Sequence, residues 1–332
     1  MTKPHRSHHR AKPGRTNGNA DSLVKVVVTN DSGEWVRPNS GEKFYIDEEA
    51  TFPEVFFELR SDSAPPYQWQ WTIEWNAHVS GLKEGVRTGK KLRSFVESGN
   101  FSSHDKTWKV GLNSKVLGGK LTVTVNVASD TFKRTVVILG RNPSEDQVRG
   151  FLAGIPNVTG FDKLLAQESR FKNFMNADNE PVVAGDAGYG MTQLTHPSPT
   201  YEQAWNWKAN VRGGAALYQQ KQASAKAYLG QQGRRYTDVQ LAHETISRWN
   251  GGSYHKWDEH TQTWVRTPEM LCDPQTGNMG WDTGVPANQN KSTGELHQRD
   301  KGEYGKMRAG QTADHPWKYS GVCYADHVEG SE

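Results

Sequence analysis

The sequence predicts an all-β domain followed by a mainly α-helical domain with a loop-rich C-terminal extension. Two observations predict this layout. Residues 22–140 contain runs of β-branched and aromatic residues separated by Gly, Pro, Asn and Ser clusters. After Pro143, apolar residues recur every three or four positions, as on one face of a helix. The expected divisions are a basic tail (1–21), a β-domain (22–140) and a helical domain (141–332) whose extension starts near residue 255.

The composition supports globular domains and argues against some functions. A chain of 332 residues can form two domains, and its 23% charged and 34% hydrophobic residues are typical of soluble proteins. No apolar run reaches about 18 residues, so no membrane insertion is expected. The first 20 residues hold five Lys or Arg and no acid, so the remainder carries 3 − 5 = −2. We therefore expect a disordered tail and no nucleic-acid partner.

The strands predicted in the β-domain follow one another without a helical stretch. They lie at 22–30, 54–61, 67–75, 120–128 and 132–139. This spacing is typical of an antiparallel sandwich, immunoglobulin-like in outline. Trp69, Trp71 and Trp75 are predicted to lie in its core.

Capping signals mark the helical domain. Ser144 with Gln147, and Thr237 with Gln240, have the spacing of capping boxes at helix starts. A chain that starts near Asn142 is therefore expected to fold without the β-domain.

One predicted helix ends in an unusually placed carboxylate. Val158, Phe161, Leu165 and Glu168 follow one another at offsets of three, four and three, which predicts that Glu168 faces the core. Three interpretations compete: an ion pair with Arg170 or Arg212, a general acid, or a metal ligand. Burial raises the pKa of a carboxyl group, which suits a general acid. No second ligand follows at helical spacing, so no metal and no cofactor are predicted.

Four short motifs follow in order around this glutamate. Together they resemble the lysozyme-like domain of lytic transglycosylases and goose-type lysozymes over about residues 144–255. In that family an E-S pair ends a helix, and a glycine-rich loop with a Gln follows. A helix with an N-x-x-x-G motif packs behind, and a Y-N-x-G stretch closes the cleft. The motifs here are Glu168-Ser169, Gly188-Tyr189-Gly190-Met191-Thr192-Gln193-Leu194, Asn210-Val211-Arg212-Gly213-Gly214 and Trp249-Asn250-Gly251-Gly252.

The resemblance implies a fold and a set of site residues. The helical region is expected to be lysozyme-like, with Glu168 as catalytic acid. Thr192 stands where the family has Met, and Trp249 where it has Tyr, which removes a hydrogen-bond acceptor. The residues expected to bind substrate are Ser169, Tyr189, Gln193, Trp249, Asn250 and Tyr254.

The implied activity is cleavage of the β-1,4 bond between N-acetylmuramic acid and N-acetylglucosamine in peptidoglycan. A muramidase is expected, because Gly185-Asp186 matches a goose-type segment whose aspartate can activate water. Asp186 is otherwise an Asx-turn residue, with Asp178 and Glu180 as other candidates. The alternatives are a lytic transglycosylase, in which Glu168 works alone, and a non-catalytic wall-binding component.

The expected setting follows from the absence of a signal-peptide core in the tail. The enzyme would be made in the cytoplasm and act on the cell wall, either as a phage lysin or as an antibacterial effector. The layout resembles effectors of type VI secretion, which implies a secretion component and an immunity protein as partners. Cys272 and Cys323 leave a disulfide and two free thiols open, and a disulfide is favoured outside a reducing compartment.

Overall fold

The computed structural model describes residues 29–80, 86–87, 89–174, 178–304 and 311–330. The described residues form two compact units. The strand-rich unit comprises residues 29–156 and 165–215, and the C-terminal unit comprises 157–164 and 216–330. The division does not follow the expected boundary at residue 141, because residues 165–215 belong with the strands.

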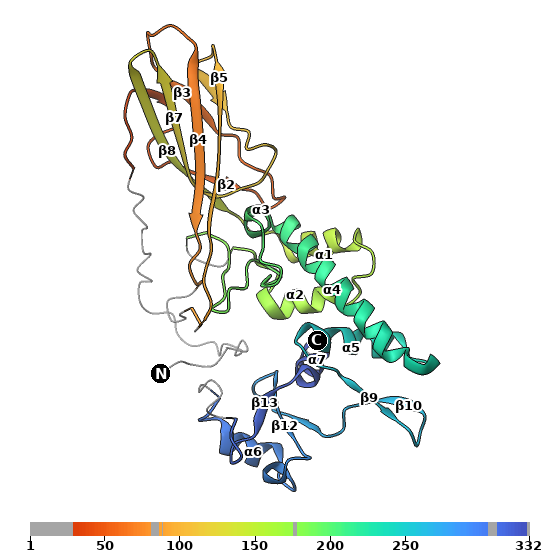
Figure 1. Cartoon of the computed structure of the whole chain (residues 1–332). Coiled ribbons are helices and arrows are strands. Elements are labelled where there is room, and N and C mark those ends of the chain that lie inside the picture. The colour runs from red at the N-terminus through yellow and green to blue at the C-terminus, as the bar shows by residue number, and fades with distance from the viewer. Residues whose placement is uncertain (1–28, 81–85, 88, 175–177, 305–310, 331–332) are drawn as a thin grey trace. The chain divides into compact units, whose positions relative to one another are not determined.

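A five-stranded sheet forms the largest layer of the strand-rich unit (Figure 1). The strands lie in the order β2 (Lys43–Ile46), β8 (Asp130–Gly140), β7 (Gly119–Val127), β4 (Tyr67–Asn76) and β5 (Ser94–Ser103). Neighbours are antiparallel except β2 and β8, which are parallel. β5 therefore lies at one edge of this sheet and β2 at the other.

A second, three-stranded sheet contributes to the same core. Its order is β1 (Trp35–Arg37), β3 (Phe56–Leu59) and β6 (Thr107–Lys109). Along β4 the buried residues alternate with more exposed ones, so Trp69, Trp71 and Trp75 all point into the core, as predicted.

The core of this unit extends beyond the strands into the following helical segment. Phe174, Tyr189, Tyr201 and Trp205 pack in one cluster with the buried residues of the sheets. A Cβ on Gly118 would lie 2.0 Å from the Trp205 ring, so the missing side chain lets the helical segment approach the sheet. The strands and this segment therefore share a core.

Five α-helices follow the large sheet: α1 (Glu145–Ala153), α2 (Phe161–Ser169), α3 (Tyr201–Trp205), α4 (Trp207–Leu229) and α5 (Asp238–Trp249). Both predicted capping boxes are confirmed, with Ser144 and Thr237 as the capping residues. In the part of the chain that the structure describes, no helix is long and apolar enough to cross a bilayer.

The C-terminal unit contains strands as well as helices. β9 (His255–Asp258) pairs with β10 (Thr263–Arg266), and a three-stranded sheet has the order β11 (Met270–Cys272), β12 (Met279–Asp282) and β13 (Trp317–Tyr319). The remaining elements are α6 (Thr293–Asp300), α7 (Gly321–Glu329) and the 3-10 turns η1 (Gln231–Gly233) and η2 (Pro286–Asn288). A disulfide joins Cys272 on β11 to Cys323 on α7, which is one of the two alternatives that the sequence left open.

The predicted fold class is wrong. The expected layout was an all-β immunoglobulin-like sandwich followed by a mainly α lysozyme-like domain with a loop-rich extension. Of the described residues, 28% are helical and 28% are in strands, distributed over several small sheets. The C-terminal strands were missed because three or four residues are too short to show alternation. The predicted tail and most of the predicted strand at 22–30 lie outside the described residues.

Candidate active site

The helix that carries Glu168 ends as the sequence predicts, at the Glu168-Ser169 pair. The next two residues, Arg170 and Phe171, have φ of 54° and 58°, in the left-handed region that favours glycine. Their amides still donate to the helix, at 3.0 Å to Ala166 O and 3.4 Å to Leu165 O. Non-glycine residues in this conformation cost of order 1 kcal/mol each and occur more often at functional sites.

The side chain of Glu168 is less enclosed than predicted. Phe161 and Leu165, on the same face of α2, are fully buried. Glu168 itself is half-buried, and Ser169 beside it is buried with its hydroxyl donating to Leu165 O at 3.2 Å. The carboxyl group therefore lies at the border of the core, because its residue is the last but one in the helix.

Two buried asparagines hold the glycine-rich loop. The side-chain oxygen of Asn210 on α4 accepts from the Thr192 amide at 2.9 Å, and its Nδ2 donates to Tyr189 O at 3.0 Å. Asn173, which follows α2, accepts from the Met191 amide at 3.1 Å and donates to Ala204 O. Asn173 thus links the segment after Glu168 to the loop.

Thr192, one departure from the resembled motif, has a role in this arrangement. Its hydroxyl donates to the Asn210 side-chain oxygen at 2.8 Å, and both residues are fully buried. The polar side chain therefore adds a hydrogen bond to the loop anchor. A methionine at this position would lack that donor.

Close packing explains two glycines of the motifs. At Gly190, with φ of 69°, a Cβ would lie 2.3 Å from Asn210 Nδ2 and 2.7 Å from Asn173 Oδ1. At Gly213 on α4, a Cβ would lie 2.8 Å from Gln203 Nε2. Gly213 therefore packs against the Gln203 side chain and Leu194.

The loop residues expected to bind substrate are partly engaged within the strand-rich unit. Gln193 is half-buried, and its Nε2 donates to Gly190 O at 2.7 Å. The Tyr189 hydroxyl accepts from the Arg93 amide at 2.9 Å, and its ring is buried. Burial raises the pKa of Tyr189 above its usual value, so its hydroxyl stays protonated at neutral pH.

Asp186, the expected base, makes two contacts that hold it in the loop. Its Oδ1 accepts from the Gly188 amide at 3.3 Å, which is the Asx-turn alternative. Its Oδ2 lies 3.7 Å from Nη1 of Arg87. The carboxylate therefore shapes the start of the loop and faces a cation.

The other carboxylate candidates, Asp178 and Glu180, surround a histidine. His78 Nε2 lies 3.1 Å from Asp178 Oδ2, and His78 Nδ1 lies 3.4 Å from Glu180 Oε2. Trp75 Nε1 donates to the same oxygen of buried Glu180 at 2.8 Å. The ligand atoms of these three residues are close enough to hold a divalent cation. Because both ring nitrogens of His78 already face carboxylates, an imidazolium bridge accounts for the same geometry.

The remaining predicted residues, Trp249, Asn250 and Tyr254, belong to the C-terminal unit. Trp249 ends α5 and its ring packs 5.6 Å from that of Phe161. Asn250 is exposed, and its backbone N–H donates to carbonyl oxygens in the last turn of α5. The Tyr254 hydroxyl donates to Asp326 Oδ1 at 2.6 Å, so the phenol holds α7.

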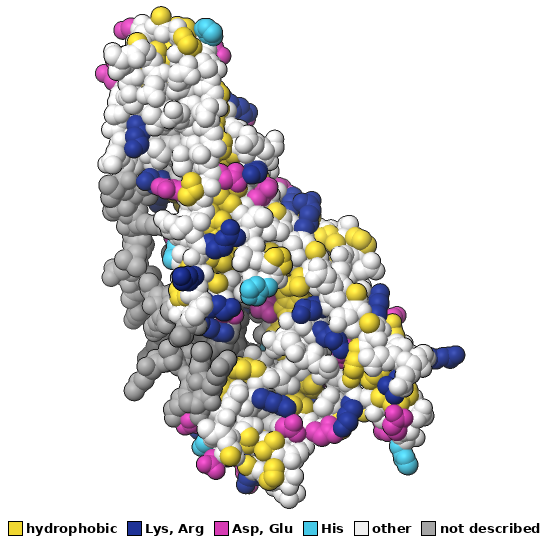
Figure 2. Space-filling model, in the orientation of Figure 1, with side chains coloured by type: hydrophobic (Ala, Val, Ile, Leu, Met, Phe, Trp, Pro, Cys, Tyr) yellow, Lys and Arg dark blue, Asp and Glu magenta, His cyan; other side chains and the backbone are white. Residues whose placement is uncertain are grey.

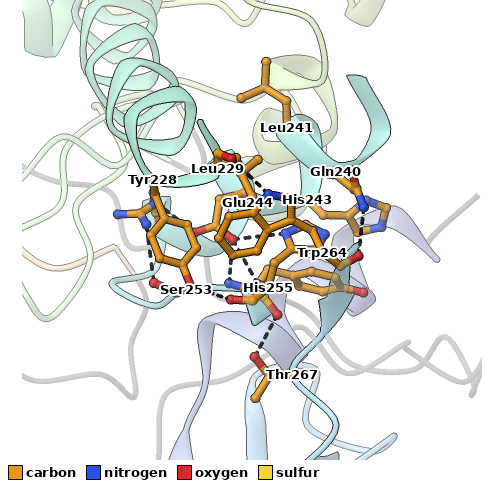
Figure 3. A network of polar contacts seen from close by, with 12 residues as sticks. Tyr228, Leu229, Gln240, Leu241, His243, Glu244, Ser253, His255, Trp264 and Thr267 are labelled. Atoms are coloured by element: carbon orange, nitrogen blue, oxygen red, sulfur yellow. Dashed lines mark hydrogen bonds and ion pairs between the residues drawn. The ribbon is translucent and has the colours of Figure 1, made fainter. Parts of the chain in front are cut away.

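A buried carboxylate positions the chain that follows α5 (Figure 3). Glu244 Oε2 accepts from the amides of Tyr254 and His255, each at 3.0 Å, and lies 3.1 Å from His255 Nδ1. Arg248 Nε donates to Oε1 at 2.9 Å. Burial alone would raise the pKa of Glu244, but these hydrogen bonds and the Arg248 charge lower it overall.

The chain matches no known protein family, and no curated protein is significantly similar to it.

Several positioning residues were missed from the sequence. Asn173 and Asn142 carry no spacing signal, although Asn142 Oδ1 accepts from the amides of Asn173 and Phe174, each at 2.8 Å. Arg93 and Glu244 were also missed. Glu244 carries no spacing signal either, because three of the four residues at offsets of three and four from it are polar (Gln240, Leu241, Ser247 and Arg248).

Proposed function

We propose that this protein cleaves the glycan strands of peptidoglycan, with Glu168 as the general acid and hydrolysis as the reaction. The carboxyl group would protonate the leaving oxygen of the glycosidic bond. Asp186 would activate water as the base. Gln193, which is half-buried in the loop, would contact the substrate, while buried Ser169 and Tyr189 would position the helix end and the loop.

The observation that carries this proposal is the link between the end of α2 and the glycine-rich loop. The Glu168-Ser169 pair stands at a helix end followed by two left-handed residues. Asn173 connects that end to the loop that carries Tyr189 and Gln193. The assignment to peptidoglycan comes from the four motifs in their order along the chain. A helix end with left-handed residues, joined to a loop by a buried asparagine side chain, is typical of pre-organised sites.

A lytic transglycosylase is the second candidate, and the contacts of Asp186 favour it. Asp186 Oδ1 already accepts from the Gly188 amide and Oδ2 faces Arg87, so both carboxylate oxygens are engaged at the start of the loop. In a transglycosylase the hydroxyl of the sugar replaces water, so Glu168 needs no second carboxylate. A non-catalytic wall-binding role is the third candidate, and it requires that Glu168 be dispensable.

The wider setting is also a proposal. The disulfide between Cys272 and Cys323 supports action outside a reducing compartment, as a wall enzyme requires. An antibacterial effector with an immunity protein and a secretion partner fits this setting, as does a phage lysin.

The decisive test is Glu168→Gln, assayed on purified peptidoglycan. The substitution keeps the size of the side chain but removes the transferable proton, so lysis should fall by at least about 100-fold. The matched control is Glu145→Gln, which changes an exposed glutamate at the start of α1. This control should lyse peptidoglycan at the wild-type rate. Wild-type lysis by the Glu168 variant would refute the proposal, whereas retained wall binding without any wild-type lysis would support the non-catalytic role.

Products separate the two chemistries. Mass spectrometry of wild-type digests should show reducing ends, and Asp186→Asn should lower product formation strongly with little change in wall binding. Mainly 1,6-anhydro ends, with near-normal rates in Asp186→Asn, would establish the transglycosylase instead.

A further inference from the structure

Described residues of the connection between β4 and β5 donate hydrogen bonds to the glycine-rich loop and to the chain just before it. The Ser80 amide donates to Val183 O at 2.8 Å, and the Arg87 amide donates to Gly185 O at 2.7 Å. Closer to β5, the Arg93 amide donates to the Tyr189 hydroxyl and its guanidinium donates to Pro199 O. Groups carried by this connection therefore lie beside the loop of the candidate active site.

The start of β5 carries a concentration of positive charge. Lys90, Lys91 and Arg93 are all exposed within four positions. Figure 2 shows basic side chains gathered over the end of β4 and the start of β5. Within the described residues, neither Lys90 nor Lys91 has a carboxylate partner, so both charges are available to an anionic ligand.

Three lysines elsewhere in the strand-rich unit pair with glutamates. Lys115 pairs with Glu97 at 2.8 Å, Lys120 pairs with Glu74 at 3.3 Å, and Lys109 pairs with Glu54. Lys90 and Lys91 differ from these three in having no such partner among the described residues.

A pocket adjoins these cations. It has a volume of about 500 Å³ and is lined by residues 93–97 and 198–201. Arg93 is one of its lining residues, and its guanidinium lies over the Phe95 ring at 4.7 Å. Val96 beside it is 59% exposed and offers an apolar contact.

The pocket runs along an open sheet edge. β5 pairs with β4 on one side, and no described strand pairs with its other side. Alternate amides and carbonyls of such an edge point outward and can pair with an extended peptide. Phe95 and Tyr201 are buried, so they present no exposed ring for stacking a nucleobase. We define the β5 edge surface as residues 90–97 and 198–201.

We propose that the β5 edge surface binds the carboxylate-bearing stem peptides of peptidoglycan. The peptide would lie along β5 with its carboxylates facing Lys90, Lys91 and Arg93, while the glycan to which it is attached reaches the neighbouring loop. This inference rests on the proposed function for its choice of peptide. It makes the enzyme selective for wall that still carries its peptides.

The test uses a charge-reversal variant of the full chain, Lys90→Glu/Lys91→Glu. The matched control is Lys43→Glu/Lys226→Glu, which changes the net charge equally at exposed lysines on β2 and α4. Binding of a fluorescent stem tetrapeptide should weaken by about tenfold in the first variant, since each exposed ion pair contributes up to about fivefold. The control should bind as the wild type does, and added salt should weaken only wild-type and control binding.

Activity provides a second readout. On peptide-bearing wall the first variant should have a KM raised about tenfold with kcat nearly unchanged, and on glycan stripped of peptides by an amidase it should match the wild type. Equal tetrapeptide binding by wild type and variant would overturn the proposal, as would binding of a single-stranded oligonucleotide in place of the peptide. Absence of all wild-type cleavage would instead refute the proposed function, because tetrapeptide binding does not require it.

Discussion

Two loop segments, one in each unit, are held by different kinds of side chain, neutral in one unit and charged in the other. In the strand-rich unit, neutral amides of Asn173 and Asn210 hold the loop at 185–193. In the C-terminal unit, the buried carboxylate of Glu244 holds the chain at 253–255, with Arg248 and His255 around it. Both sets of hydrogen bonds order candidate site residues, but only those made by Glu244 depend on a charged side chain.

The difference follows the size of the apolar core. The strand-rich unit buries many aromatic residues in one cluster, among them Trp69, Trp75 and Trp205. The C-terminal unit has a smaller apolar cluster around Trp281 and Trp317, together with the disulfide and several buried carboxylates. A unit with a small core needs additional cross-links, and here they are covalent and electrostatic.

The largest expected effect on the free energy of unfolding comes from changing Glu244, the buried carboxylate that holds residues 253–255. Glu244→Gln removes the charge that Arg248 and His255 face and places an amide donor against backbone donors. The free energy of unfolding should fall by about 3–5 kcal/mol, as for a buried ion pair that loses one partner. Urea denaturation followed by circular dichroism measures it. Glu259→Gln, at an exposed pair with Arg234, should change stability by less than about 0.5 kcal/mol; a similarly small loss at Glu244 would show that charge is not what holds this segment.

The disulfide comes next. Cys272→Ala/Cys323→Ala should lower the free energy of unfolding by about 2–4 kcal/mol, since the bond closes a sequence separation of 51. Reductant should destabilise the wild type by a similar amount and leave the double variant unaffected. Wild-type stability in reductant would show that the charged anchors suffice.

The role of the neutral Asn210 side chain can be tested by replacing it with a carboxylate of the same shape. Asn210→Asp turns the donor that faces Tyr189 O and Gln203 O into an acceptor, which should cost about 1–3 kcal/mol at pH 7. Protonation restores a donor, so the loss should shrink as the pH falls. Asn126→Asp is the control, because Asn126 uses only its acceptor oxygen in its contact with Thr131. A loss at position 210 that is independent of pH would contradict this account.

The smallest effect is the pH dependence of the wild type. The folded pKa of Glu244 is lowered, so its contribution to stability is complete above the unfolded pKa of about 4.3 and is lost as the pH falls through the folded value. The pKa of Asp300 is also lowered: burial would raise it, but hydrogen bonds from Arg299, His315 and Trp281 prevail. The contribution of these two carboxylates to stability should therefore be constant from pH 7 to 5 and fall below about 4.3. Glu244→Gln should flatten part of that slope, and an unchanged slope would assign the effect elsewhere.

The sequence predicted local features better than the layout. The strands at 67–75, 120–128 and 132–139, both capping boxes and the end of α2 were predictable, because each depends on short-range periodicity or side-chain spacing. β5 was missed because its residues are mostly polar, with only Phe95 fully buried. The candidate active site was proposed from its motifs, and two of its glycines, Gly190 and Gly213, have close contacts with side chains of the same unit.

The anchors could not be predicted for a different reason. Asn173, Asn142 and Glu244 act through contacts that fold-level packing brings together, so no spacing in the sequence marks them. Asp186 was placed correctly in its loop, but its facing cation comes from Arg87, about a hundred positions earlier in the chain. Partners at such separations are set by tertiary structure.

The core shared between the strands and residues 174–205 has a consequence for how this chain can vary between genomes. Recombination often exchanges segments at points where few contacts are cut. A junction at residue 141 looks suitable in the sequence, yet it would separate Gly118 from Trp205 and Gly140 from Phe174, where a Cβ would lie within 2.2 Å of the ring. Homologues should therefore not exchange segments at residue 141, and chimaeras joined there should be insoluble.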